Sequence, residues 1–240
     1  MQHVEPATGY LSLHDSDNRG RVKDAVKKNG IVLGSASAKL QDDRAIVEEA
    51  VKQNGYALKF ASTRLQGDYT IVHEAVRQNG CALKFASERF QKDCNTVKEA
   101  VKQNGYALKF ASERFQHDSA LVRGAVQQNG FALEAASARL KNERSIVQEA
   151  LRQNSLALKF ASERLRNDRA LVMEAVKQNG HALRFASEKL QEDRALRQIA
   201  SESQRELPCG PVGPYDPYDL CTPCCRCCRC CPCGITNTKL

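Results

Sequence analysis

Long apolar runs are missing from this 240-residue chain, and none approaches the roughly 18 residues that a membrane-spanning helix needs. The first 20 residues also lack the basic segment and the apolar stretch of a secretory signal, so we expect no export. No phosphate-loop, paired-histidine or nucleophile-elbow motif is present, which argues against an enzyme. These absences predict a soluble protein without catalytic activity.

The chain is instead rich in repetition. A 25-residue phrase, VKQNGYALKFASERFQHDSALVRGA at 101–125, occurs in seven uninterrupted copies between Val26 and Ala200. Five positions are identical in all copies and are represented in that phrase by Asn104, Leu108, Ala111, Ser112 and Ala125. A fixed period of this length is typical of solenoids, in which each unit stacks on its neighbours.

Each copy carries two stretches of helical spacing. In DRALVMEAVKQNG, Asp168 is a favourable N-cap, and Leu171 and Val172 begin an apolar face. The glycine that follows, Gly180, is expected to close this helix in the left-handed conformation. HALRFASEKLQE predicts a second, more deeply buried helix. Helices of about ten residues are unstable alone, so the predicted fold class is all-α, an α-solenoid of stacked two-helix 25-residue repeats.

The composition divides the chain into four segments. We expect an N-terminal segment with a degenerate half-repeat at 1–25, the seven-copy helical array at 26–200, a proline-rich linker at 201–220 and a disordered cysteine-rich tail at 221–240. The half-repeat is the phrase NRGRVKDA, which predicts one further helix of the first type before the array.

The phrase QNGxALKFASERLxxD resembles the short helical repeat known as domain of unknown function 4116. The resemblance covers residues 26–200, and every copy matches it. It implies a helical-repeat fold, and it brings no established activity and no catalytic residues.

One invariant polar column falls at the carboxyl end of the first predicted helix, within its apolar arc. A buried amide needs hydrogen-bond partners, so we interpret this column as a structural ladder bonded to backbone groups of its own or the next unit. Its members are Asn29, Asn54, Asn79, Asn104, Asn129, Asn154 and Asn179.

A second column is basic and is predicted to face outward, available to a partner. This basic column consists of Lys59, Lys84, Lys109, Lys159 and Arg184, and Gly34 and Glu134 interrupt it. The leading hypothesis is a non-catalytic scaffold that binds another protein. The alternative is a binder of nucleic acid or another polyanion that follows phosphates along the basic side chains.

The position four residues before Phe60 and its counterparts differs from copy to copy, and we define it as the variable column. Its members are Ile31, Tyr56, Cys81, Tyr106, Phe131, Leu156 and His181. A base-reading repeat protein would show coherent polar or aromatic pairs in such a column. This mixture favours core filling, which makes nucleic acid the weaker hypothesis.

The tail concentrates thiols in CTPCCRCCRCCPCG. Its cysteines are Cys221, Cys224, Cys225, Cys227, Cys228, Cys230, Cys231 and Cys233. They could bind zinc or copper(I) as thiolates, or carry palmitoyl chains that attach the array to a membrane, or remain unmodified or linked by disulfides. The spacing does not choose among these, and the array itself is expected to need no cofactor.

Cys81 and Cys94 are isolated cysteines at positions that other copies fill with Tyr, Phe, Ser or Arg. Such tolerated free thiols favour a reducing compartment. We therefore expect a cytoplasmic protein, with the nucleus also possible and membrane association if the tail is acylated.

Overall fold

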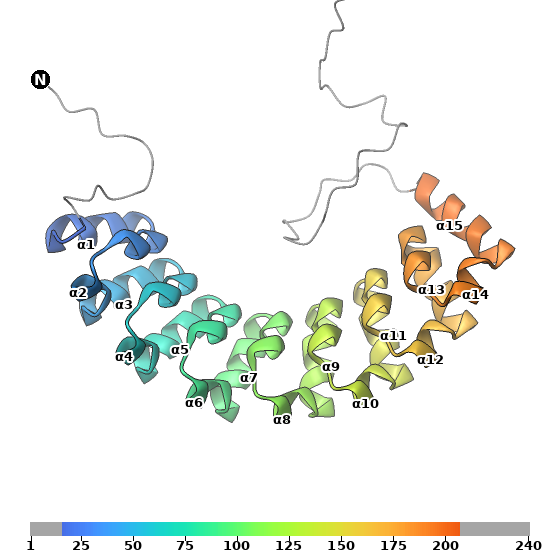
Figure 1. The fold of residues 1–240 in the computed structure, drawn as a ribbon, viewed down its shortest axis with the longest axis horizontal. Coiled ribbons are helices and arrows are strands. Elements are labelled where there is room, and N and C mark those ends of the chain that lie inside the picture. Colours follow the sequence, from blue (N-terminus) through green and yellow to red (C-terminus); the bar gives the residue numbers. More distant parts are fainter. Residues whose placement is uncertain (1–15, 207–240) are drawn as a thin grey trace, which may run out of the picture. The chain divides into compact units, whose positions relative to one another are not determined.

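The computed structural model describes residues 16–206, and this part of the chain consists of helices joined by short loops, without a strand. The predicted all-α fold is therefore confirmed. Seven units of three helical segments follow one another from Arg19, and a last helix closes the series. Figure 1 shows these units stacked along an arc.

Each unit begins with a ten-residue α-helix. These long helices are α1 Arg19–Lys28, α3 Arg44–Gln53, α5 Tyr69–Gln78, α7 Cys94–Gln103, α9 Ser119–Gln128, α11 Arg144–Gln153 and α13 Arg169–Gln178, and the closing helix is α15 Arg194–Glu206.

A six-residue 3-10 helix follows each long helix. The 3-10 helices are η1 Gly30–Ser35, η2 Gly55–Phe60, η3 Gly80–Phe85, η4 Gly105–Phe110, η5 Gly130–Ala135, η6 Ser155–Phe160 and η7 Gly180–Phe185.

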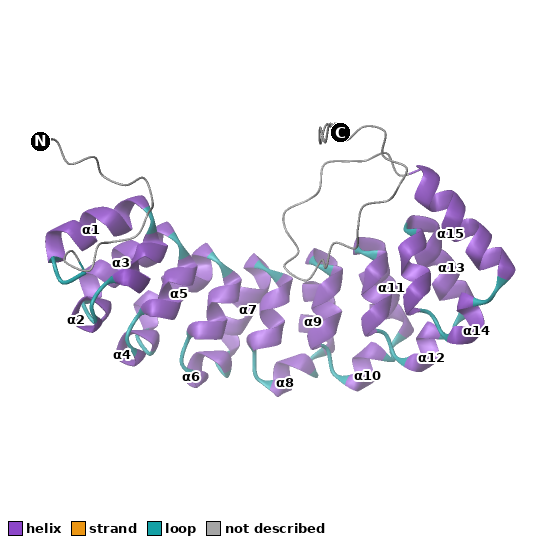
Figure 2. Ribbon diagram, turned by 45° about the horizontal axis from the view of Figure 1, so that its top comes forward, coloured by secondary structure: helices purple, strands orange, loops and turns teal. Residues whose placement is uncertain are grey.

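Each unit ends with a four-residue α-helix. These short helices are α2 Ala38–Gln41, α4 Thr63–Gln66, α6 Glu88–Gln91, α8 Glu113–Gln116, α10 Ala138–Lys141, α12 Glu163–Arg166 and α14 Glu188–Gln191. They follow the outer edge of the arc (Figure 1), and a second view shows the long helices standing side by side (Figure 2).

The long helices begin where the sequence predicts. The carboxylate of Asp118 accepts hydrogen bonds from the backbone N–H groups of Ala120 and Leu121 at 2.9 and 3.1 Å, which satisfies donors that the first turn leaves free. The predicted half-repeat forms most of α1, and its Asn18 is the N-cap.

The predicted second helix is wrong as a single α-helix, because it is divided into the 3-10 helix and the short α-helix. Ala111 and Ser112 between them are extended. The Ser112 N–H donates to the Gln91 carbonyl of the preceding unit at 2.9 Å, so it cannot continue a helix within its own unit. The same bond between units recurs along the array and ties neighbours together.

The predicted left-handed glycine is also wrong, since no glycine among residues 16–206 has a positive φ. The glycine column instead permits a close approach between units. A Cβ atom on Gly105 would overlap the carbonyl oxygen of Ala125 in the next long helix. In the six units that carry glycine, its missing side chain therefore leaves the space that the backbone of the invariant alanine fills.

A single apolar core runs through all the units and is built mainly from the Leu, Val and Ala columns. The side chains of Leu108 and Leu133, in neighbouring units, have no exposed surface. Each unit completes the burial of the next, which is the packing expected of a solenoid.

Ion pairs at the surface also join successive long helices. Arg44 lies 2.6 Å from the N-cap carboxylate of Asp68, one unit on. A hydrogen bond from the Thr70 hydroxyl, together with this guanidinium, lowers the pKa of Asp68 to about 2. Equivalent pairs join Arg19 to Asp43, Arg144 to Asp168 and Arg169 to Asp193.

The serine column holds the N-cap position of the short helices, although only Ser62 and Ser162 accept a capping hydrogen bond with their side chains, and the partner of the hydroxyl depends on the preceding unit. Ser162 Oγ donates to the side chain of Asn142 at 2.7 Å, and Ser62 Oγ donates to Asp42. Ser87 Oγ is buried without a partner in the described part of the chain, because Gly67 occupies the corresponding position. The hydroxyls of Ser37, Ser112 and Ser137 are likewise buried without a partner within residues 16–206, so only Asp42, Asn142 and Asn167 supply the acceptor.

Replacing Gly67 by asparagine is expected to raise the free energy of unfolding by about 1 kcal/mol. Gly67 has φ −96° and ψ 0°, a conformation open to any residue, and an added Cβ would lie 3.9 Å from Ser87 Oγ. Denaturant melts of the full chain measure the change. Gly67→Ala controls for the backbone effect, and an equal gain from Gly67→Asn in a Ser87→Ala background would contradict the proposed bond.

Candidate binding surface on the inner side of the arc

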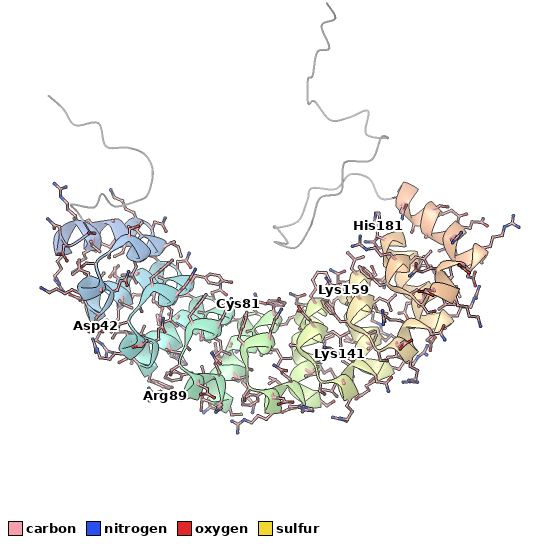
Figure 3. The ribbon with its side chains drawn as sticks, in the orientation of Figure 1. Asp42, Cys81, Arg89, Lys141, Lys159 and His181 are labelled. Carbon is pink, nitrogen blue, oxygen red and sulfur yellow. The ribbon has the colours of Figure 1, made fainter. Side chains whose placement is uncertain are left out.

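The 3-10 helices place the variable column and the basic column on one surface. The two columns occupy the second and fifth positions of each 3-10 helix, and side chains three residues apart eclipse one another in this geometry. Figure 3 shows Lys159 and His181 on the inner side of the arc, with Asp42 and Arg89 on the outer side. We call the surface formed by the two columns the inner face.

The prediction that the variable column fills the core is wrong for Ile31, Tyr56 and His181, which are exposed, whereas Phe131 and Leu156 pack against the core. Tyr56 is 39% exposed and Ile31 is 37% exposed, while Cys81 is buried. His181 is exposed, and Tyr106, Phe131 and Leu156 are partly buried. The variation between copies was the available signal, because the identical leucine and alanine positions are the buried ones.

The basic column lies over aromatic rings. The Lys159 ammonium is 4.7 Å from the ring centre of Phe160 and 4.9 Å from that of Phe131 in the preceding unit. The Arg184 guanidinium is 4.6 Å from the Phe185 ring centre. These cation–π contacts hold the charged groups in place while the side chains stay exposed. The inner face therefore presents ordered cations beside apolar rings.

Lys109 differs from the rest of the basic column. Its ammonium lies 2.7 Å from the carboxylate of Glu134, which holds the same position in the next unit. The hydrogen bonds with Glu134 and with the Tyr106 hydroxyl raise the pKa of Lys109. This pair neutralises the middle of the inner face and separates Lys59 and Lys84 from Lys159 and Arg184.

The asparagine column lies behind the inner face and fixes the backbone of the variable column. Asn104 ends α7 and begins η4, and its side-chain oxygen accepts the N–H of Tyr106 at 3.0 Å. The same bond, at 2.9 to 3.1 Å, joins each asparagine to the variable residue of its own unit. Each unit therefore presents its variable side chain from the same backbone geometry.

Residues 16–206 contain no group of three or more His, Cys, Asp or Glu side chains arranged to hold a metal ion. The eight cysteines of the predicted tail lie outside these described residues. Cys81 and Cys94 have free thiols, and burial raises the pKa of Cys81. No helix of the described part is long and apolar enough to span a bilayer.

The geometry defines an α-solenoid with a partly aromatic, basic inner face. Four matches to the family model described as domain of unknown function (DUF4116) cover residues 18–66, 68–116, 118–163 and 144–191, and the chain belongs to this family. Each of these matches spans nearly two of the 25-residue units. Searches of curated proteins and of solved structures found no match.

Proposed function

We propose that this array is a non-catalytic scaffold that binds a segment of another protein along the inner face. The observation that carries the proposal is the variable column, whose side chains differ from unit to unit while their backbone is held alike. Such a surface can bind a partner selectively, because each unit contacts a different side chain of the partner with its own variable residue.

The chemistry of the inner face specifies the kind of segment. Exposed cations at Lys59, Lys84, Lys159 and Arg184 favour carboxylates on the partner. The neighbouring rings, including that of Tyr56, offer contacts for apolar side chains. We therefore propose an extended segment that alternates acidic and apolar residues.

A polyanion such as nucleic acid is the alternative, and the charge pattern supports it less. A continuous phosphate track needs unpaired cations along its length, whereas Lys109 pairs with Glu134 at the centre. Gly34 leaves a further gap in the first unit. A steep loss of binding with added salt, equal for all sequences tested, would favour the alternative.

Removing two inner-face cations in Lys84→Ala with Lys159→Ala is expected to weaken partner binding about tenfold or more. Affinity capture with the full chain, followed by titration of the captured segment as a peptide, measures this. The matched control is Lys102→Ala with Lys177→Ala, which removes two exposed lysines from α7 and α13. Equal loss in both variants would place the binding surface elsewhere.

For the tail, we propose a role in metal binding or membrane attachment through the cysteines at 221–233. Eight thiolates suffice for two four-coordinate zinc ions or for a copper(I) cluster. Metal analysis of protein purified under reducing conditions and hydroxylamine-sensitive acyl labelling in cells separate the two roles. Protein that is metal-free and unlabelled would refute both.

A further inference from the structure

The junction between the sixth and seventh units departs from the repeat pattern at two positions. Ser155 stands where the other six units have glycine, and Arg166 stands where five units have glutamine. α12 and α14, which meet at this junction, lie along the outer edge, away from the inner face (Figure 1).

Ser155 adds a Cβ atom at the place where the units approach most closely. In the glycine-bearing units, such an atom would overlap an alanine carbonyl of the next long helix. The junction accommodates Ser155, and α13 packs less closely against η6 and α11 than the corresponding helices do in most other units. A wider spacing of the two units follows from this single side chain.

A hollow of about 720 Å³ lies between α12 and α14 at this junction. Its lining includes three basic side chains, Arg164, Arg166 and Lys189, together with the hydroxyl of Ser187. Arg164 is anchored by hydrogen bonds from its Nε and one terminal nitrogen to Asn142, both at 2.8 Å. The exposed carboxylates of Glu163 and Glu188 also border the hollow and leave the lining with one net positive charge.

Arg166 has no partner for its buried donor. Glutamine at this position donates to backbone carbonyls of its own unit, as Gln191 does to Ala186 at 2.8 Å. The Nε atom of Arg166 is inaccessible to water, and no acceptor within residues 16–206 bonds it. No carboxylate in the described part of the chain forms an ion pair with its guanidinium. A buried guanidinium donor without an acceptor is costly, and an anion that bonds it after a rotation of the side chain into the hollow would relieve that cost.

We propose that this hollow binds a phosphate group, carried by a monoester or free as the ion. The fork of Arg166 can donate two parallel hydrogen bonds to phosphate oxygens, and the ammonium of Lys189 can supply a second positive charge. Ser187 Oγ now donates to Asn167 at 2.7 Å and can accept from the ligand or turn its proton to it. The single net positive charge of the lining predicts weak binding of free phosphate, in the millimolar range.

The test titrates the full chain with inorganic phosphate and, separately, with phosphoserine at constant ionic strength, and follows the thermal unfolding midpoint. Arg166→Gln introduces the residue that other units carry, and its midpoint without ligand verifies that it folds. Lys141→Gln is the matched control, because it makes the same change one unit earlier, outside the hollow.

The wild-type chain and Lys141→Gln should be stabilised at similar ligand concentrations, and Arg166→Gln should need at least about ten times more. Tighter binding of phosphoserine would identify a phosphorylated side chain as the source, and tighter binding of inorganic phosphate would identify the free ion. Absence of a midpoint shift, or an equal response of Arg166→Gln, would overturn the proposal.

Discussion

Replacing Gly105 by alanine is expected to lower the free energy of unfolding of the array by about 3 kcal/mol. The new methyl group would overlap the carbonyl oxygen of Ala125, and this oxygen belongs to the backbone of α9, which cannot rotate away. The two units would have to separate, and the loss of burial would extend along both sides of the junction.

The matched control is Gly124→Ala, because Gly124 lies within α9 and has no atom within 4 Å of an added Cβ. This change should raise stability by up to about 1 kcal/mol through helix propensity alone. Denaturant melts of the full chain compare the two variants. Similar small changes in both would show that the glycine column does not serve close packing.

Replacing Asn104 by alanine is expected to cost about 2 kcal/mol. The side chain accepts the N–H of Tyr106 at 3.0 Å where α7 ends and η4 begins, and alanine would leave this donor without its acceptor. Asn104→Ser keeps an acceptor at a shorter reach and should recover part of the loss. If Asn104→Ala is as stable as the wild-type chain, the asparagine column has a role other than capping.

The helical repeat could be predicted because its signals are local. An N-cap such as Asp118 and the apolar residues that follow it lie within one turn or two of each other, and the 25-residue period reveals the stacking. The buried leucine column, represented by Leu108, was equally visible as an identical position.

The division of the second helix was not predictable from one copy alone. It depends on the hydrogen bond from Ser112 to the carbonyl of Gln91, which joins two units, and no local propensity reports such a bond. The role of Gly105 has the same origin, since the atom that excludes a side chain belongs to Ala125 of the next unit. Contacts between neighbouring copies therefore decide the conformation here, and they outweigh the local preferences from which the sequence of one copy was interpreted.

The candidate surface was predicted in part. The exposed basic column was identified, whereas the variable column was assigned to the core because a short apolar run does not distinguish an α-helix from a 3-10 helix. The Lys109–Glu134 pair had a signal in the sequence, since a basic and an acidic residue occupy the same position in successive copies.

The most direct test of the inner face as a binding surface is photo-crosslinking in cells. A photoreactive phenylalanine analogue replaces Tyr56, which is 39% exposed on the inner face, or Tyr69, which is 61% exposed at the start of α5. The proposal predicts that the Tyr56 position forms crosslinks to an acidic, apolar segment of one protein and that the Tyr69 position does not. Equal crosslinking from both positions, or crosslinking from Tyr69 alone, would contradict it.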